Sequence, residues 1–322
     1  MVFAAEFTRF ADHICLRDGD TSLTYAQTLA LGRQLTTGLR PRSLVVLRCA
    51  VTIEAVAAYA ALLVDGHVPL LLEDSLTPAL ADAIIDRYAP DAVVSPASGD
   101  VQLRAGGTVL HPDLALLLTT SGSTGSPKLV RLGAAGVAAN AAAIASYLGL
   151  TAAERAFVHL PISYSYGMSI LNSHFSVGAS VCLTRRSVME AGYWDELAAQ
   201  AATSIAGVPF HYTTIRRLGE ARLAIPSLTT LTQAGGRLDP RIVSHFADWA
   251  ARTGRRFIVM YGQTEAGPRI AYLPPDKAAA APDAIGIPIP GVTIALHDND
   301  GAPVADGTPG EMVIHSPAVM LG

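Results

Sequence analysis

The sequence predicts an α/β protein with two doubly wound, mostly parallel sheets flanked by helices, followed by the beginning of a small β-barrel. Short apolar runs alternate with helical stretches along most of the chain, which is typical of parallel sheets covered on both faces. Half of the 322 residues are apolar and only 16% are charged, which fits a large buried core. After Tyr272, prolines at 274, 275, 282, 288 and 290 prevent helix formation. We therefore expect β-structure at the end of the chain.

The first third of the chain predicts a β-α-β pattern. Its strands are expected at Ser43–Cys49, His67–Leu72 and Ala92–Ser95. Its helices are expected at Ile53–Val64, which stops at Gly66, and at Ala79–Tyr88. This pattern predicts a first α/β subdomain over residues 1–110.

The pattern then repeats with different spacing, which predicts a second α/β subdomain over residues 111–280. Its strands are expected at Leu114–Leu118, Leu129–Leu132, Phe157–Leu160, Ser180–Leu183, Thr229–Thr232 and Phe257–Tyr261. Its helices are expected at Ala134–Leu148, Tyr193–Ala202, His211–Leu218 and Arg241–Arg252. Residues 281–322 are expected to form the partial β-barrel, with antiparallel strands at Val292–His297 and Glu311–His315.

Composition and charge exclude several classes of protein. Lys plus Arg is 23 and Asp plus Glu is 27, a net charge of −4, and no basic stripe indicates a nucleic-acid partner. Cys15, Cys49 and Cys182 are scattered without a CxxC pair, so we expect core thiols in a reducing cytoplasm. Residues 132–153 and 156–184 carry no Asp, Glu, Lys or Arg and could span a bilayer by length alone. Gly, Asn, Ser, His and Pro interrupt them, so we expect buried elements and no membrane partner.

A loop rich in Gly, Ser and Thr, Leu118–Lys128 (LTTSGSTGSPK), follows an apolar strand. Its backbone N–H groups and hydroxyls can surround phosphate oxygens, and Lys128 can offset their charge. It differs from the common NTPase loop because Ser126 and Pro127 separate Gly125 from Lys128. A flexible linker is the alternative, but linkers seldom lie between buried strands. We therefore predict a phosphate-binding loop.

This loop resembles the phosphate-binding signature of the adenylate-forming superfamily, which includes acyl-CoA synthetases, luciferase-type ligases and non-ribosomal adenylation domains. Four further segments match the family's motifs in order. They are residues 161–167 (PISYSYG, with Tyr164 at the family's His position), 234–238 (AGGRL), 261–265 (YGQTE) and 310–313 (GEMV), with Gly322 closing the last. On these five motifs, which cover most of the chain, it is identified as a member of the superfamily.

The resemblance implies that a carboxylic acid reacts with ATP to give an acyl-adenylate and pyrophosphate. The acyl group then passes to a thiol, either CoA or the phosphopantetheine of an acyl or peptidyl carrier protein. It implies that Tyr261 stacks on adenine, Thr264 binds the α-phosphate and Glu265 holds Mg²⁺, a hard cation that prefers oxygen ligands. The β- and γ-phosphates are expected on Thr119, Thr120, Ser121, Gly122, Ser123, Thr124, Gly125 and Lys128.

The resemblance assigns further residues to the nucleotide and the acyl group. Gly235 and Gly236 suit a close approach of backbone to a ligand, although an ordinary strand-to-helix turn would also use them. Tyr164 is expected to close the acyl pocket and His211 to line it, with a core residue and a helix cap as the respective alternatives. Arg237 belongs to the same segment and is placed with Gly235 and Gly236 at the nucleotide site, but it departs from the small residue of many relatives and receives no firm role there. The same motifs add Ala234 to the acyl site, and Gly262 and Gln263 to the nucleotide site.

The substrate is expected to lack an α-amino group. Amino-acid-activating relatives place an Asp just after the P-x-x segment to pair with the ammonium, whereas residues 164–169 contain no carboxylate. Burying an ammonium without a counter-ion is costly. We therefore expect a small carboxylic acid of aryl or medium acyl type. An amino-acid adenylation domain of a peptide synthetase and a non-catalytic nucleotide- or acyl-binding remnant are the alternatives.

The chain stops at Gly322, where relatives continue into a ribose-binding Asp, a hinge and a lid domain that carries a catalytic Lys. We therefore expect the large N-terminal domain of a longer ligase, with the C-terminal lid domain absent. By itself this chain is expected to bind adenylate but to form it slowly, because a missing cationic donor typically costs on the order of 10²–10³ in rate.

Overall fold

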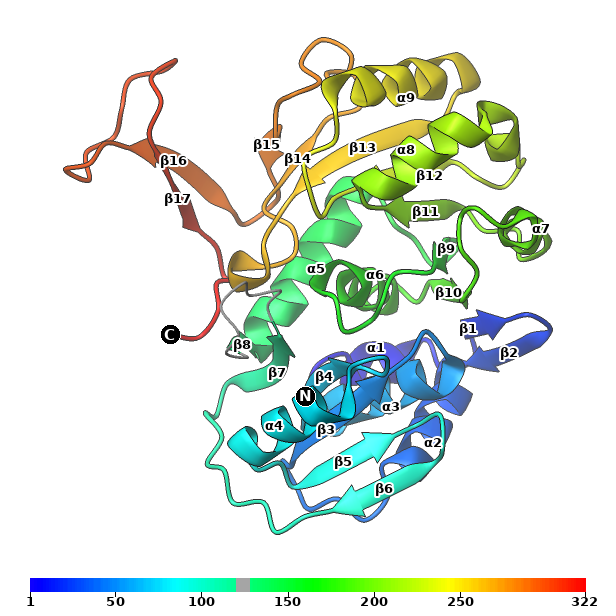
Figure 1. The fold of residues 1–322 in the computed structure, drawn as a ribbon, viewed down its shortest axis with the longest axis vertical. Helices are drawn as coiled ribbons and strands as arrows, with labels where there is room; N and C mark the ends of the chain where they lie inside the picture. The colour runs from blue at the N-terminus through cyan, green and yellow to red at the C-terminus, as the bar shows by residue number, and fades with distance from the viewer. Residues whose placement is uncertain (120–127) are drawn as a thin grey trace.

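The computed structural model describes residues 1–119 and 128–322. Two large sheets lie one above the other with helices between and around them, and a two-stranded ribbon projects to one side (Figure 1). Both sheets are parallel at their centres, which confirms the predicted fold class.

The first sheet has six strands in the order β6-β5-β3-β4-β7-β8. Its central strands are parallel, and β6 and β8 close its edges in antiparallel pairs. The strands are β3 (Leu44–Cys49), β4 (Val68–Glu73), β5 (Ala92–Ser95), β6 (Asp100–Leu103), β7 (Leu114–Thr119) and β8 (Leu129–Gly133). Successive side chains of β3 enter different cores, Val45 and Leu47 the one between the sheets and Leu44 and Val46 the one on the opposite face.

The second sheet has nine strands in the order β15-β14-β13-β12-β11-β9-β10-β1-β2. It is parallel from β13 to β1, and antiparallel at both ends. The strands are β1 (Ile14–Asp18), β2 (Thr21–Thr24), β9 (Arg155–Val158), β10 (Ser180–Leu183), β11 (Ser204–Gly207), β12 (Thr230–Gln233), β13 (Arg256–Tyr261), β14 (Ala271–Leu273) and β15 (Ile287–Pro288). The remaining strands, β16 (Thr293–His297) and β17 (Glu311–His315), form the projecting antiparallel ribbon.

The helices cover both faces of the sheets. Helices α3, α5 and α6 contribute to the main core between the sheets, and α8 and α9 cover the outer face of the nine-stranded sheet (Figure 1). The helices are α1 (Ala4–Arg9), α2 (Tyr25–Leu35), α3 (Ile53–Val64), α4 (Pro78–Tyr88), α5 (Ala134–Leu148), α6 (Ser165–Phe175), α7 (Ala191–Ala199), α8 (Pro209–Leu218) and α9 (Pro240–Thr253). Two short 3₁₀ helices, η1 (Glu220–Leu223) and η2 (Thr264–Ala266), complete the set.

The sheets draw their strands from distant parts of the chain. Strands β1 and β2, near the N-terminus, join the nine-stranded sheet through β10, and β7 and β8 complete the six-stranded sheet. The division into subdomains at residues 110 and 280 stays a prediction.

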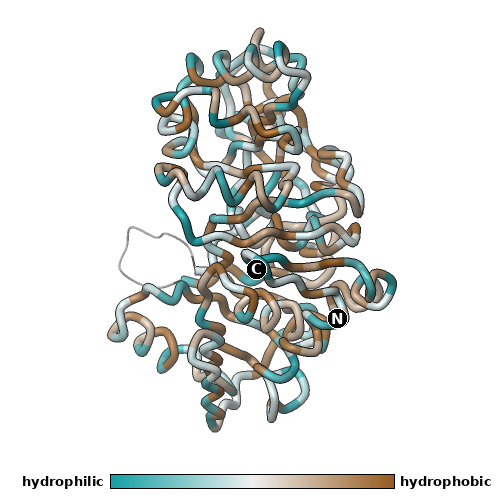
Figure 2. Tube along the Cα trace, turned by 90° about the vertical axis from the view of Figure 1, so that its right-hand side faces the viewer, coloured by the Kyte–Doolittle hydropathy of each residue, from teal (hydrophilic) through white to brown (hydrophobic). Residues whose placement is uncertain are grey.

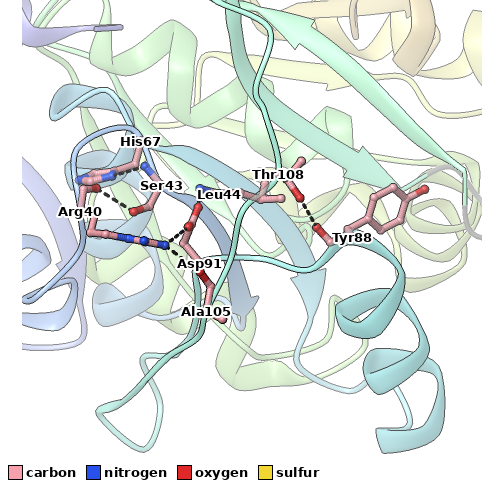
Figure 3. Close-up of polar contacts among 8 residues, drawn as sticks. All are labelled: Arg40, Ser43, Leu44, His67, Tyr88, Asp91, Ala105 and Thr108. Carbon is pink, nitrogen blue, oxygen red and sulfur yellow. Dashed lines mark hydrogen bonds and ion pairs between the residues drawn. The ribbon is translucent and has the colours of Figure 1, made fainter.

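A polar cluster ties together the amino ends of β3, β4 and β5 (Figure 3). Asp91 accepts hydrogen bonds from the Leu44 backbone N–H at 2.8 Å and from the Arg40 guanidinium at 2.5 Å. The Ser43 backbone N–H donates to His67 Nδ1 at 3.2 Å. Because these bonds satisfy backbone groups at the strand ends, they hold the parallel strands in register.

The uncharged stretches of the sequence are buried elements, as expected, and include α5 and α6. Along the trace in Figure 2, hydrophilic residues interrupt the hydrophobic stretches in every layer of the molecule. Among residues 1–119 and 128–322, no helix combines the length and apolar character needed to cross a bilayer.

Candidate active site

Two of the predicted motif segments leave the nine-stranded sheet side by side. Strands β12 and β13 are parallel neighbours, so their carboxyl ends meet at the same edge. The buried Gln233 side chain donates from Nε2 to the carbonyls of Ala234, at 3.1 Å, and Gly236, at 3.0 Å. These bonds hold the turn after β12, in which Gly235 adopts a φ of +79° that favours glycine. Ligands of open α/β sheets commonly bind at such an edge.

A groove with a cavity volume of about 480 Å³ lies between these two segments. Residues 235–238 line one side, residues 259–262 line another, and residues 282–285 complete the wall. The structure thus brings together five of the residues predicted to bind the nucleotide: Gly235, Gly236, Arg237, Tyr261 and Gly262. Sequence reasoning missed residues 282–285, whose only signal was the proline-rich change in composition after Tyr272. The volume suits a ligand of nucleoside size.

Two glycines of the motifs permit close packing around the groove. A Cβ on Gly235 would collide with Tyr164 Oη and lie 3.0 Å from a Val208 methyl. A Cβ on Gly262 would collide with the Pro268 carbonyl. Both positions therefore require glycine for the packing of the chain itself, in addition to any approach of a ligand.

Thr264 and Glu265 lie on η2, directly after the segment that ends β13. Thr264 Oγ1 donates to Ser165 Oγ at 3.1 Å, which links η2 to the first residue of α6. The backbone carbonyl of Glu265 accepts from the Met320 N–H at 2.7 Å, so the end of the chain packs against this turn. The Glu265 side chain is half-buried and forms no ion pair with the described residues. Gln263 is exposed.

The predicted acyl-site residues have different surroundings. Tyr164, just before α6, is 36% exposed, and its hydroxyl lies against Gly235. Ala234 is buried in the turn after β12. His211 Nδ1 accepts from the Val208 N–H at 3.0 Å, which caps α8, and its ring packs on His159 with centroids 4.5 Å apart. His211 is therefore a helix cap in this structure, and it does not line the groove.

The phosphate loop lies largely outside the described residues. This applies to the predicted site residues Thr120, Ser121, Gly122, Ser123, Thr124 and Gly125. Thr119 ends β7 and is half-buried, and Lys128 precedes β8 and is exposed. Thr119 pairs with Leu129 across the β7-β8 ladder, so both ends of the loop are held by the edge of the six-stranded sheet. Neither Thr119 nor Lys128 lines the described part of the groove.

Arg269 is a residue that sequence reasoning missed. It is 2% exposed, and its guanidinium lies over the Tyr166 ring, 4.0 Å from the ring centroid. Burial raises the pKa of the Tyr166 hydroxyl to about 12 although Arg269 opposes this shift, and the same two effects act on Tyr164. Both tyrosines are therefore neutral near pH 7. The only signal in the sequence was a single charge in an otherwise apolar segment soon after YGQTE.

Comparison with known proteins covers most of the chain. The profile of the family described as AMP-binding enzyme matches residues 95–322. A feruloyl-CoA synthase from an Amycolatopsis species is 28% identical over 211 residues, which is 65% of this chain and 42% of that protein. The match therefore covers less than half the length of this relative.

Two solved structures share the fold over nearly the whole chain. The o-succinylbenzoate CoA synthetase MenE from Bacillus subtilis, in complex with the acyl-adenylate intermediate OSB-AMP, aligns with a TM-score of 0.83 and 19% identity. That alignment covers 99% of this chain and 70% of MenE. ATP-bound MatB from Rhodopseudomonas palustris has a TM-score of 0.83 and 23% identity, over 99% of this chain and 71% of MatB.

Proposed function

Because this chain belongs to the AMP-binding enzyme family, we propose that it activates a carboxylic acid with ATP and passes the acyl group to a thiol. A carboxylate oxygen attacks the α-phosphorus of ATP, and pyrophosphate leaves. The thiolate sulfur then attacks the acyl carbon of the resulting acyl-adenylate, and AMP leaves. The chain need not supply a nucleophile for either step, so its residues bind and orient the reactants.

The observation that carries this proposal is the groove between the two motif segments. Tyr261 ends β13 in its wall, and Gly235 and Gly236 form the facing turn. An aromatic ring beside exposed backbone provides a stacking surface and hydrogen-bonding groups for a purine base. Thr264, which Ser165 holds beside α6, is proposed to bind the α-phosphate next to this base. The phosphate loop and Lys128 are proposed to bind the β- and γ-phosphates.

The donor set near the groove fits a hard divalent cation together with phosphates. Glu265 offers a half-buried carboxylate that no described Lys, Arg or His engages. Mg²⁺ usually takes one or two carboxylates and completes its shell with water and phosphate oxygens. The part of the chain that the structure describes holds no group of three or more protein ligands that would suggest another metal. Glu265 would hold Mg²⁺, which when bound offsets phosphate charge.

The acid and the acceptor are proposed from the side chains and from the names of the relatives. Residues 164–169 provide no carboxylate for an ammonium, which favours an acid without an α-amino group. Feruloyl-CoA synthase and o-succinylbenzoate CoA synthetase are named for CoA products. We therefore propose CoA as the acceptor, with a carrier-protein phosphopantetheine as the alternative thiol of the same chemistry.

Calorimetric titration with AMP tests the nucleotide site directly. Wild-type chain is expected to bind AMP, and Tyr261→Ala is expected to weaken binding about tenfold, because loss of one base–aromatic stack costs roughly 1–3 kcal/mol. Phe210→Ala is the matched control, since Phe210 is 58% exposed on α8 and lies outside the groove. Absence of AMP binding, or equal weakening by both variants, would contradict the proposed site. Pyrophosphate exchange with a panel of amino acids and simple acids then separates the two substrate classes.

A further inference from the structure

Arg269 is a buried charge without an opposite charge. Among the Lys, Arg, Asp and Glu residues that the structure describes, it alone is buried, at 2% exposure. No described carboxylate forms an ion pair with it. Isolated buried charges are costly, and proteins normally pair them. Burial of this unpaired charge therefore costs free energy, and a bound anion would offset that cost.

The partners of the Arg269 guanidinium are all uncharged. Its Nε donates to Met260 Sδ at 3.3 Å, and a thioether is a weak acceptor. One terminal nitrogen donates to the Pro268 carbonyl at 2.8 Å. An arginine carries five N–H donors in a planar fork that matches a carboxylate. The Tyr147 hydroxyl is a further neutral partner of this side chain. Within residues 1–119 and 128–322, no partner of the guanidinium carries a negative charge.

A small cavity beside Arg269 does not provide the missing charge. The cavity has a volume of about 30 Å³, room for about one or two waters. Glu154 lines it, but its carboxylate accepts from Thr203 Oγ1 at 2.5 Å and forms no ion pair with Arg269. His174 also lines it, and its Nε2 has no partner in the described chain. Water could satisfy an N–H group here but would leave the positive charge uncompensated.

Arg269 contacts Met260, a residue that lines the groove. Met260 lines both the groove and the cavity beside Arg269, and its thioether accepts from Arg269 Nε. On the other side, Arg269 stacks on Tyr166, whose ring centroid is 6.3 Å from that of Tyr164. Tyr164 is partly exposed, and its hydroxyl lies against Gly235 in the groove wall. Met is flexible, so a change of the Met260 side chain would bring an acyl chain from the groove to Arg269.

We propose that Arg269 binds a second carboxylate of the acid substrate, so that this chain selects dicarboxylic acids. The inference rests on the proposed function, because the first carboxylate must react at the nucleotide while the second is held at Arg269. The Tyr164 hydroxyl makes no hydrogen bond to a described residue and is a further donor beside the acyl path. Holding both ends of a short acid fixes the reacting carboxylate in place, which is how binding energy contributes to rate.

Matched acyl-adenylate analogues test this selection. The probes are acyl-sulfamoyl-adenosines in which succinyl, glutaryl and adipyl groups are each compared with a methyl-ended acyl group of equal length. For at least one length, wild-type chain is expected to bind the carboxylate-ended member roughly 10- to 100-fold more tightly, as for a hydrogen-bonded charged pair. Arg269→Met is expected to abolish the preference and leave the affinity for AMP and the methyl-ended analogues within about twofold.

Two further variants separate the loss of the Arg269 interaction from a general effect on the protein. Arg217→Met is the matched control, because Arg217 is exposed on α8, and it should keep the preference. Arg269→Lys keeps the charge without the fork and should retain part of the preference, so it also serves if Arg269→Met folds poorly. If the preference survives in Arg269→Met, the inference is overturned and the proposed function stands. The same holds if wild-type chain binds AMP but shows no preference at any length. Failure of wild-type chain to bind AMP or any analogue overturns the proposed function as well.

Discussion

His159 is a half-buried imidazole with one satisfied nitrogen. Its Nδ1 lies 3.0 Å from the Tyr193 hydroxyl, and its Nε2 has no hydrogen-bond partner in the described residues. Burial, with a smaller effect of His211, lowers the pKa of His159 to about 3. Burial also lowers the pKa of His211 and His174. Folding therefore keeps these imidazoles neutral.

This lowered pKa predicts a loss of stability in mild acid. Above pH ~6.5, the unfolded value for His, both states are neutral and the contribution of His159 to stability is complete. As the pH falls further, His159 is protonated in the unfolded chain but stays neutral in the folded chain. The free energy of unfolding therefore falls by about 1.4 kcal/mol per pH unit. Urea unfolding between pH 7.5 and 5 measures this slope.

Two variants isolate the His159 contribution to that slope. His159→Gln cannot be protonated, so its free energy of unfolding should fall less steeply with decreasing pH, by about 1.4 kcal/mol per pH unit. His315→Gln, at an exposed position on β17, should follow wild-type chain. An unchanged slope in His159→Gln would show that His159 gains a proton in the folded state.

At the scale of elements, α2 and α3 pack so closely that one position accepts only hydrogen. A Cβ on Gly32 of α2 would lie 2.6 Å from the Ala57 carbonyl carbon and 2.7 Å from Ala61 Cβ, both on α3. These atoms belong to helix backbone and to a short side chain, so neither can move aside easily. The contact positions α3, in which every residue except Glu54 is buried.

Gly32→Val should therefore separate the two helices and lower stability. Overpacking a core contact typically costs about 1–3 kcal/mol, which outweighs any gain from replacing a helical glycine, roughly 0.5–1 kcal/mol. Chemical denaturation measures the difference, and Ala30→Val, at an exposed position of the same helix, should change stability far less. Equal effects of the two variants would show that β-branching in α2, rather than the contact with α3, is responsible.

The local sequence pattern predicted the helices that have a regular apolar composition. It missed a helix whose polar side chains are satisfied by partners distant in the chain. Helices α3 and α5 begin and end at the predicted residues because Ala-rich runs with clear stops define them. Helix α6 was missed because its mixed sequence, SYGMSILNSHF, is buried on every side. Its polar groups bond elsewhere, as when Tyr59 of α3 donates to Asn172 Oδ1 at 2.9 Å. The sequence of α6 contains no information about such a partner, because the partner lies on another helix.

At the scale of the molecule, the groove joins three separate segments of chain. Its walls come from the turn after β12, the end of β13 and residues 282–285. These segments belong to different parts of the fold and not to one helix or strand. A ligand that contacts all three stabilises their common arrangement, and the stabilisation follows from mass action alone.

AMP should therefore raise the melting temperature of the whole chain. At a free concentration of 100 times its dissociation constant, a ligand stabilises the native state by about 2.7 kcal/mol, which corresponds to a shift of several degrees. Differential scanning calorimetry measures the shift, and Tyr261→Ala should show a smaller one at the same AMP concentration. Ribose 5-phosphate is the control without a base. A shift equal to that with AMP would place the phosphate, rather than adenine, in the groove.

The sequence by itself determined the family, the alternation of strands and helices, and five residues that line one groove. These features depend on order along the chain, such as glycines beside a strand end, apolar runs of strand length and short motifs at fixed spacing. Such signals are local, so they can be recognised without coordinates.

Tertiary structure alone decided which neighbours those residues have. Residues 282–285 close the groove only because β14 and β15 return the chain to β13. His211 caps α8, which is the alternative that the sequence left open, and its place in an acyl pocket stays a prediction. In the sequence Arg269 resembles any surface charge, and it becomes a buried, unpaired one because Tyr166 and Met260 cover it. The free-energy cost of burying a charge depends on its solvent exposure and on partners distant in the chain. Neither can be inferred from the residues next to it in the sequence.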